Sequence, residues 1–527
     1  MAKDLLKDRE KYRLTLRKKT INKLFSQKRK LNSNTKLEIC PFKLKNIPEN
    51  LKVSFRIDKN DLENTLNKTI EFLYSENINY VKFGCFLLRR FFWVISMEQE
   101  TSVQNNNNSY NFYIDIFLKK NILNVYLNIF TKHINELDIV AELIWSLVNM
   151  TNFKSSKNGF AYVIKLVDDD FLNIYKKIFN SNESVIISDL YSVLYNIGYE
   201  SADCCYKIFN SGLLKEAINR YTSNSKINNE SNIFEINEGL QFISVFSRIS
   251  EMFNYNQKEC FFTIFKYFIF SSEDEGILTH SIIGLFHLLD IEIQNNKKDI
   301  LNLIIESNII KVIISFKLEK FNKYLFLFLF NVLKLSKIYI ENIDSNLLLK
   351  NFNEINLLNY YEKIFTQIRN VDIRTEIMNV VLEISKKFDD NIIKYFVESS
   401  FFKEIVMGNL NYCDFNIRLL CITIILNCIN IQNFDIAIIY LNYKIMSYII
   451  NEILEEEEDE KMINNILLTI KYYIDCGNRI DINPFKEEIR YSKIEEILQK
   501  KHSKYNENQI KLYENILKEL NVSHMIK

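Results

Sequence analysis

The sequence predicts an all-α protein built as a helical-repeat solenoid. Only 9 Gly and 3 Pro occur among its 527 residues, whereas β-rich proteins and phosphate-binding loops need many turn glycines. Hydrophobic residues make up 47% of a chain that is too long for one ordinary compact core. From about residue 61 onward, amphipathic helical stretches alternate with short polar breaks. Together these three observations favour one elongated array of helices.

A recurring landmark gives the length of the repeat. An apolar helix carries an Asn near its C-terminal end in IWSLVNMTN, VLYNIGYES, FLFNVLKLS and IILNCINIQ, at Asn149, Asn196, Asn331 and Asn427. The step from Asn149 to Asn196 is 47 residues, and the step from Glu383, which takes this place in VVLEISKKF, to Asn427 is 44. Steps of about 40–47 residues are typical of armadillo and HEAT repeats, which stack to leave a long concave surface.

Charge is distributed unevenly along the chain. Residues 1–31 contain twelve Lys or Arg and three acids, a net charge of +9, and the overall charge of +1 leaves −8 for the remainder. In KYRLTLRKKTINKLFSQKRK, apolar residues recur at helical spacing among basic ones, which predicts a basic amphipathic helix. A basic arm on an acidic body indicates a segment that binds an acidic partner or its own body. Direct binding of nucleic acid is disfavoured because the negative body repels phosphate.

Other classes of protein lack support in the sequence. The nine Cys are scattered and form no C-x-x-C pair, so neither a zinc site nor a disulfide framework is expected. His280 and His287 are seven residues apart, but no third ligand completes a metal site. Nucleotide-binding, zinc-protease and serine-hydrolase motifs are missing from the sequence, so we expect no enzyme, no catalytic residue and no cofactor. The most apolar stretch, Tyr324 to Leu333, is far shorter than the ~20 residues of a membrane span, so no membrane insertion is expected.

Three segments resemble the importin-alpha family of nuclear import adaptors. Leu16-Arg17-Lys18 and Lys28-Arg29-Lys30, followed by Asn32, are similar to the family's importin-beta-binding segment. AELIWSLVNMTNFKSS and SDLYSVLYNIGYES look like its second and third armadillo repeats, and KIEEILQKKHSKYNENQIKLYENILKEL resembles its closing helix pair. The segments lie in the family's order and at about its spacing, so the resemblance covers nearly the whole chain.

The resemblance implies an armadillo-repeat, right-handed superhelical solenoid with a basic N-terminal arm. The expected parts are the arm and linker in residues 1–45, the repeats in residues 46–490, and C-terminal capping helices in residues 491–527 that contact a recycling export carrier. The implied function is an import adaptor that shuttles between cytoplasm and nucleus, binds Lys- and Arg-rich localisation signals of cargo proteins, and is linked by its arm to importin beta. The residues implied for importin-beta binding, and for autoinhibition of the free groove, are Arg13, Arg17, Lys18, Lys19, Lys23, Lys28, Arg29 and Lys30.

The resemblance also implies a site for the cargo signal. In the family, a Trp supports the aliphatic stem of a cargo Lys or Arg, and an Asn one turn later holds the cargo backbone. Trp145 and Asn149 match this pair and share a helix face. Asn196 repeats the Asn, and Glu200 falls where the family carries an acid that faces a cargo lysine. Asn331 and Asn427 are the corresponding residues of the distal groove.

The chain departs from the family pattern at the other aromatic positions. It has only two Trp, and Ser192, Leu327 and Thr423 stand where the family has further Trp residues. We therefore expect an altered cargo preference, above all in the distal groove. The alternative hypothesis is a helical-repeat scaffold protein with a basic arm and no role in transport, which would not retain importin beta.

Overall fold

The computed structural model confirms an all-α fold over the residues that it describes. These are residues 62–102, 116, 119–151, 163–181, 183–223, 230–321, 323–387, 389–410, 414–429, 433–455, 457–478, 483–501 and 505–520. In these ranges every regular element is a helix and none is a strand. The basic residues predicted to bind importin beta all precede residue 62, so that prediction lies outside the described part of the chain.

The described helices fall into two compact units. Unit 1 takes in the described residues up to Ser307 together with Lys317–Phe328, and unit 2 takes in Asn308–Phe316 and the described residues from Leu329 onward. Helix α18 (Leu325–Asn342) contributes its first turn to unit 1 and the rest to unit 2.

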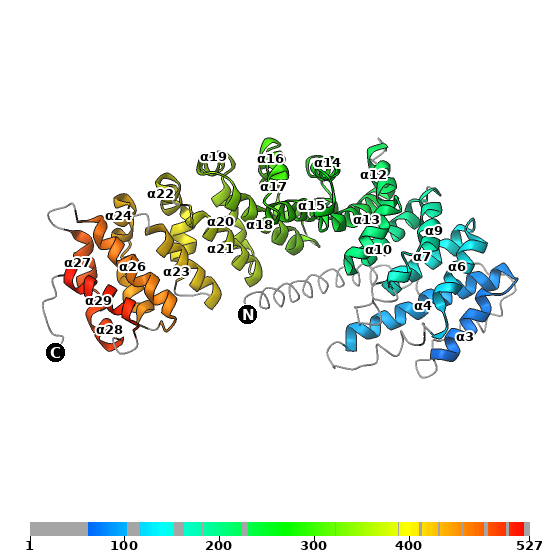
Figure 1. The fold of residues 1–527 in the computed structure, drawn as a ribbon, viewed down its shortest axis with the longest axis horizontal. Helices are drawn as coiled ribbons and strands as arrows, with labels where there is room; N and C mark the ends of the chain where they lie inside the picture. The colour runs from blue at the N-terminus through cyan, green and yellow to red at the C-terminus, as the bar shows by residue number, and fades with distance from the viewer. Residues whose placement is uncertain are drawn as a thin grey trace. The chain divides into compact units, whose positions relative to one another are not determined.

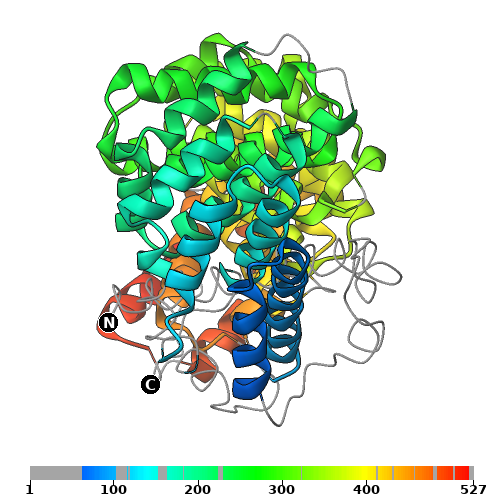
Figure 2. The same ribbon diagram turned by 90° about the vertical axis from the view of Figure 1, so that its right-hand side faces the viewer.

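Unit 1 is a stack of helical repeats. Its helices are α3 (Leu62–Leu73), α4 (Ile78–Ser102), α6 (Ile122–His133), α7 (Leu137–Thr151), α9 (Asp169–Phe179), α10 (Ser184–Glu200), α11 (Ala202–Asn210), α12 (Leu213–Ser223), α13 (Glu230–Ser247), η1 (Ser250–Met252), α14 (Tyr255–Ser271), α15 (Glu275–Gln294), α16 (Asp299–Glu306) and η2 (Leu318–Lys320). The long helices α4, α7, α10, α13 and α15, which close successive repeats, pack against one another in that order, and we call them the third helices. In Figure 1, α12 lies above α13, and α14 lies above α15. Figure 2 shows α3 and α4, at the blue end of the colour scale, side by side.

Unit 2 is built from three-helix repeats. After α17 (Ile309–Ser315) and α18, its repeats are α19 (Ser345–Ile355), α20 (Leu357–Gln367) and α21 (Val371–Ser385); α22 (Asp390–Glu398), the π-helix η3 (Phe401–Met407) and α23 (Phe415–Ile429); α24 (Phe434–Asn442), α25 (Ile445–Tyr448) with the π-helix η4 (Ile449–Leu454), and α26 (Glu460–Cys476); and α27 (Pro484–Arg490), α28 (Ile494–Lys501) and α29 (Glu507–Glu519). The first helices α19, α22 and α24 lie on one side and the third helices α21, α23 and α26 on the other (Figure 1). Repeats of three helices are the armadillo form, whereas HEAT repeats have two.

Side-chain contacts connect the helices on the two sides of the boundary that the sequence predicts near residue 490. The expected boundary between residues 490 and 491 falls between α27 and α28. Lys486 of α27 forms an ion pair with Glu519 of α29 at 3.0 Å, and Arg490 Nε donates to the carbonyl of Leu520 at 3.0 Å. These contacts connect α27 with α29, and α27 also packs against α24, α25 and α26, so the boundary stays a prediction.

Residues in the left-handed backbone conformation form the corner between the first and second helices of several repeats. Asn308 (φ 54°) precedes α17, Asn356 (φ 53°) precedes α20, Lys444 (φ 52°) precedes α25, and Gly212 (φ 86°) precedes α12. Asn adopts this conformation more readily than most residues that have a side chain. The chain therefore makes sharp corners with Asn, which explains how it folds as a repeat protein with only 9 Gly.

Helix α15 is the apolar centre of unit 1. By length and composition it is the one helix in the described residues that could cross a membrane, but 72% of its apolar window is buried inside the protein. It packs against α13, α14 and α16. The fully buried ring of Phe265 on α14 lies directly against the backbone at Gly284, where an added Cβ would come within 2.1 Å of the ring. These contacts identify α15 as a core helix of this unit.

Candidate ligand-binding surface

Two adjoining third helices of unit 1 carry the four residues predicted for the proximal site. Trp145 and Asn149 lie on α7, and Asn196 and Glu200 lie on α10, which packs directly against α7. The Asn196 side-chain amide donates a hydrogen bond of 3.1 Å to the hydroxyl of Thr151, the last residue of α7. The structure thus brings the four residues together on neighbouring helices.

The two residues predicted for the distal groove lie in unit 2. Asn427 on α23 donates a hydrogen bond of 3.1 Å to the hydroxyl of Ser385, the last residue of α21. This contact has the same form as the one between Asn196 and Thr151, because in each case the Asn links one third helix to the end of the preceding one. Asn331 lies on α18. The repeated Asn therefore joins consecutive repeats at two of its four positions.

Two of the four asparagines are buried. Asn149 and Asn331 are each 1% exposed, whereas Asn196 and Asn427 are half-buried. The Oδ1 atom of Asn149 is enclosed and accepts no hydrogen bond from the described residues. The amides of Asn149 and Asn331 would meet a ligand only after the side chains that cover them had moved. Their contact with a cargo backbone stays a prediction.

The indole ring of Trp145 already supports a cation from the chain itself. The Arg89 guanidinium carbon, on α4, lies 4.4 Å from the centroid of the Trp145 ring. Arg89 Nε is also 2.6 Å from a carboxylate oxygen of Glu142, an ion pair in which the N–H is not aimed along the hydrogen-bond direction. Burial raises the pKa of the Glu142 carboxyl, and the charge of Arg89 opposes that rise. This cluster is not apparent from the sequence, because Arg89 and Glu142 are 53 residues apart.

A second ring of the third helices is covered in the same manner. The guanidinium carbon of Arg248, which follows α13, lies 4.5 Å from the centroid of the Tyr199 ring on α10. Burial raises the pKa of the nearby Cys205 thiol to about 12, and the charge of Arg248 opposes this. The chain therefore places its own cations on two aromatic rings beside the predicted residues. Each contact joins different helices, so spacing along the sequence does not reveal it.

Charge is segregated between the helices of unit 1. The third helices α7, α10, α13 and α15, which we call the acidic layer, contain ten acids and no Lys or Arg. The helices α6, α9, α11, α12, α14 and α16 contain seven acids and eight Lys or Arg. The acids of the layer are Asp138, Glu142, Asp189, Glu200, Glu230, Glu235, Glu238, Glu275, Asp290 and Glu292. The negative charge of the body is therefore concentrated on one set of helices.

Cations from other helices balance part of this charge. Ion pairs join Asp138 to Lys82, Glu142 to Arg89, Glu235 to Arg220 and Glu292 to Lys258. These four bases lie on α4, α12 and α14. The side chains of Asp189, Glu200 and Asp290 are half-buried at the surface of the layer. The four helices of the acidic layer themselves supply ten acids and no Lys or Arg.

Unit 2 has no comparable layer. Its third helices α18, α21, α23, α26 and α29 contain nine acids and eight Lys or Arg. Positive and negative side chains are therefore mixed on the helices that carry Asn331 and Asn427. A ligand with several positive charges would be attracted to the acidic layer more strongly than to the third helices of unit 2.

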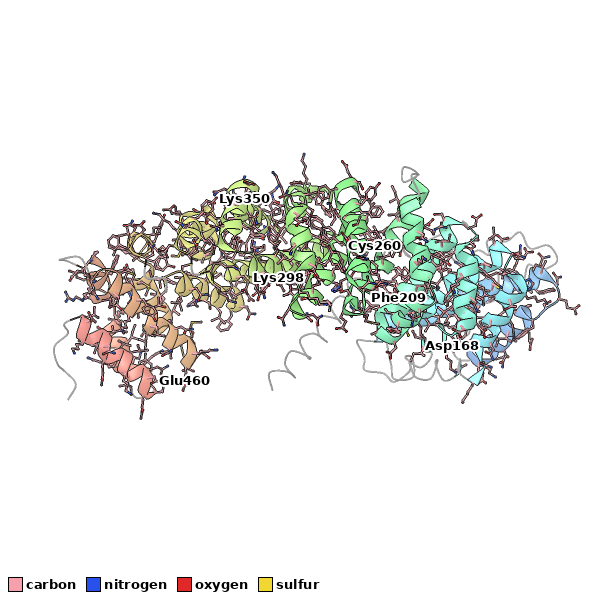
Figure 3. All side chains as sticks on the ribbon, turned by 45° about the horizontal axis from the view of Figure 1, so that its top comes forward. Asp168, Phe209, Cys260, Lys298, Lys350 and Glu460 are labelled. Carbon is pink, nitrogen blue, oxygen red and sulfur yellow. The ribbon has the colours of Figure 1, made fainter. Side chains whose placement is uncertain are left out.

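One pocket of unit 1 lies at the junction of two helices outside the acidic layer. It has a volume of about 480 Å³ and is lined by Val167, Asp168, Asp169, Leu172, Lys207, Asn210 and Ser211, at the junction of α9 and α11. Asp168, labelled in Figure 3, forms an ion pair of 3.3 Å with Lys207 across it. Within the described ranges no group of three or more His, Cys, Asp or Glu side chains could hold a metal ion.

The fold places the chain among helical-repeat solenoids. No family model and no curated protein matches the sequence. Among solved structures, the chain is similar to an engineered protein with a TM-score of 0.58 and 12% identity, over 86% of this chain and 98% of that one. It is also similar to a chain from a study of a conserved phosphorylation switch that controls the interaction between cadherin and beta-catenin, with a TM-score of 0.54, 9% identity and 86% of each chain covered. At such identities, the similarity establishes the fold alone.

Proposed function

We propose that this chain is an adaptor that binds extended Lys- and Arg-rich segments of other proteins on the acidic layer of unit 1. The observation that supports the proposal is the segregation of ten acids, with no Lys or Arg, onto four adjacent helices. Carboxylates that converge on one surface attract cationic chains and form charge-assisted hydrogen bonds with them. The stacked third helices provide neighbouring positions at regular intervals, which suits an extended ligand.

The more specific proposal is a nuclear import adaptor of the importin-alpha type. In this role the cargo is a Lys- or Arg-rich localisation signal, the basic arm in residues 1–45 binds importin beta, and a recycling export carrier binds the C-terminal end. The protein would then move between cytoplasm and nucleus. Support comes from the resemblance of the arm and of the α7 and α10 segments, and from the position of Trp145, Asn196 and Glu200 on adjoining helices.

Charge reversal on the acidic layer tests the binding surface. The triple variant Asp138→Lys/Asp189→Lys/Glu200→Lys should bind a fluorescent lysine-rich peptide at least about tenfold more weakly in 0.15 M salt, because each carboxylate–ammonium pair at 4 Å is worth about 1 kcal/mol even in bulk water. Fluorescence anisotropy measures the dissociation constant. The matched control, Asp169→Lys/Asp170→Lys/Asp203→Lys, makes the same charge change at exposed positions on α9 and α11. Equal losses in the two variants would contradict binding on the acidic layer.

Deletion of the arm tests its role as a competitor for the same surface. A chain without residues 1–45 should bind the lysine-rich peptide about fivefold or more tightly, because the basic run Lys28 to Lys30 no longer competes with it. The same anisotropy measurement applies, with the complete chain as the reference. Unchanged or weaker binding would rule out autoinhibition by the arm.

A scaffold protein without a transport role is the second candidate. The coverage of Trp145 by Arg89 and the burial of Asn149 and Asn331 favour it, because they leave fewer of the implied cargo contacts accessible. Retention of importin beta on the immobilised chain separates the candidates. The import adaptor should retain importin beta through residues 9–31 and lose it when they are deleted, whereas a scaffold should not retain it at all.

A further inference from the structure

A guanidinium group of the chain fills an enclosed site between α4 and α7. The guanidinium carbon of Arg89 lies 4.4 Å from the ring centroid of Trp145 and 5.4 Å from that of Phe86. Its Nε atom is 2.6 Å from the Glu142 carboxylate, and the side chains of Arg89 and Glu142 are 4% and 9% exposed. A cation that touches aromatic rings and a carboxylate away from water is held more strongly than one on an open surface.

We propose that Glu142, Trp145 and Phe86 form a guanidinium-binding site, the guanidinium box, and that Arg89 is its built-in occupant. The box selects an arginine-type side chain over a lysine-type one. A planar guanidinium stacks on an indole while its edge pairs with a carboxylate, whereas an ammonium group is a compact point charge. The role of the box in peptide recognition rests on the proposed function. In that role the box is a subsite for a peptide arginine, next to the acidic layer, and it becomes accessible when the Arg89 side chain moves out.

Removal of Arg89 leaves the box chemically incomplete. Glu142 then becomes a nearly buried carboxylate that has lost its counter-charge, and such a group destabilises the fold until a cation or a proton replaces the partner. The Arg89→Ala variant also leaves a space that matches the lost part of the side chain. Ethylguanidinium has the size, planarity and charge to fill it.

Chemical rescue of Arg89→Ala tests the box directly. Ethylguanidinium should raise the thermal midpoint of Arg89→Ala by several degrees while leaving that of the parent chain unchanged, with a dissociation constant on the order of 1 mM for so small a ligand. The neutral isostere ethylurea should bind at least about tenfold more weakly, and ethylammonium should fall between the two. In a Trp93→Phe background Trp145 is the sole tryptophan, so its fluorescence reports occupancy of the box.

Two variants serve as controls. Lys82→Ala removes a cation from the same pair of helices, but its ion pair with Asp138 is 21% and 60% exposed at its two side chains, so ethylguanidinium should not rescue it. Arg89→Ala/Glu142→Gln retains the indole and the space but lacks the carboxylate, so it should show no preference for ethylguanidinium over ethylurea. If Arg89→Ala does not fold alone, the measurement becomes the folded fraction recovered with each ligand. Equal effects of ethylguanidinium and ethylurea, or no effect of either, would overturn the inference.

Peptide binding separates failure of the box from failure of the adaptor proposal. Arg89→Ala should bind an arginine-containing peptide about tenfold more tightly than the parent chain does, and a lysine-only peptide with unchanged affinity. If rescue occurs but the parent chain binds neither peptide, the box stands and the adaptor proposal fails. If the parent chain binds both peptides but rescue does not occur, the adaptor proposal stands and the box is wrong.

Discussion

The variant Glu292→Gln should lose about 3–5 kcal/mol of unfolding free energy in unit 1, because it breaks a buried ion pair on one side only. Lys258 Nζ lies 3.2 Å from one Glu292 carboxylate oxygen, and the other oxygen accepts the backbone N–H of Ile300 at 2.8 Å. The side chains of Lys258 and Glu292 are 5% and 1% exposed. Glu292 therefore ties α14 and the start of α16 to α15, and the Gln variant leaves the ammonium group of Lys258 buried beside a neutral amide.

A second variant and an exposed pair make this prediction specific. Lys258→Met/Glu292→Leu removes both charges and should lose only about 1–3 kcal/mol, the cost of leaving the Ile300 N–H without an acceptor. Asp168→Asn breaks an ion pair whose side chains are 46% and 57% exposed and should lose less than about 1 kcal/mol. Because repeat arrays need not unfold in one step, hydrogen exchange of the α14–α16 amides should accompany urea denaturation. A loss below about 1 kcal/mol for Glu292→Gln would contradict the prediction.

The variant Gly284→Ala should destabilise unit 1 by about 2 kcal/mol or more, although alanine is the better helix former. An added Cβ would lie 2.1 Å from Cζ of Phe265 and 2.5 Å from two further ring atoms, and the Phe265 ring is fully buried. The ring must leave its place, and overpacking of this kind costs about 1–3 kcal/mol, while displacement of a core Phe costs about 3–5 kcal/mol. The gain in helix propensity, about 1 kcal/mol, does not offset this.

Shortening the opposing side chain should reverse part of the loss. In Gly284→Ala/Phe265→Leu the closest ring atom is gone, so the two changes should couple favourably in a double-mutant cycle measured by thermal unfolding. Gly198→Ala is the comparison, because its added Cβ would meet nothing closer than 3.0 Å and should cost less. A Gly284→Ala protein as stable as the parent chain would show that the Phe265 ring moves freely, against the close packing described here.

The repeat architecture could be predicted from the sequence because it depends on residue class. Helical periodicity and the steps of 44 and 47 residues between corresponding positions of similar helices predicted an all-α repeat array, and the structure confirms it. The three-helix form of the repeats was harder to foresee, since first helices such as α22 and α24 have only nine residues each and leave a weak periodic signal.

The site could be predicted only in part. Helical spacing placed Trp145 with Asn149 on one helix face, and the family resemblance pointed to Asn196 and Glu200. In the structure the two helices that carry them pack against each other. The sequence alone could not predict how deeply each side chain is buried, because burial depends on how neighbouring helices pack. The burial of Asn149 was therefore not foreseen. The pairing of Arg89 with Glu142 and Trp145 was also hidden, because it depends on the alignment of α4 with α7 across a long segment of chain.

The asparagine corners bear on how stiff each repeat is. A glycine at the corner before α17 or α20 would give the unfolded chain more backbone freedom to lose, whereas Asn308 and Asn356 reach the same left-handed angles from a narrower range of conformations. Substituting glycine at these corners should therefore ease local strain while loosening the hinge between the two helices. With asparagine at these corners, the angle between the first and second helices of a repeat should change little. Bending of the array under an applied force would then occur between repeats and not within them.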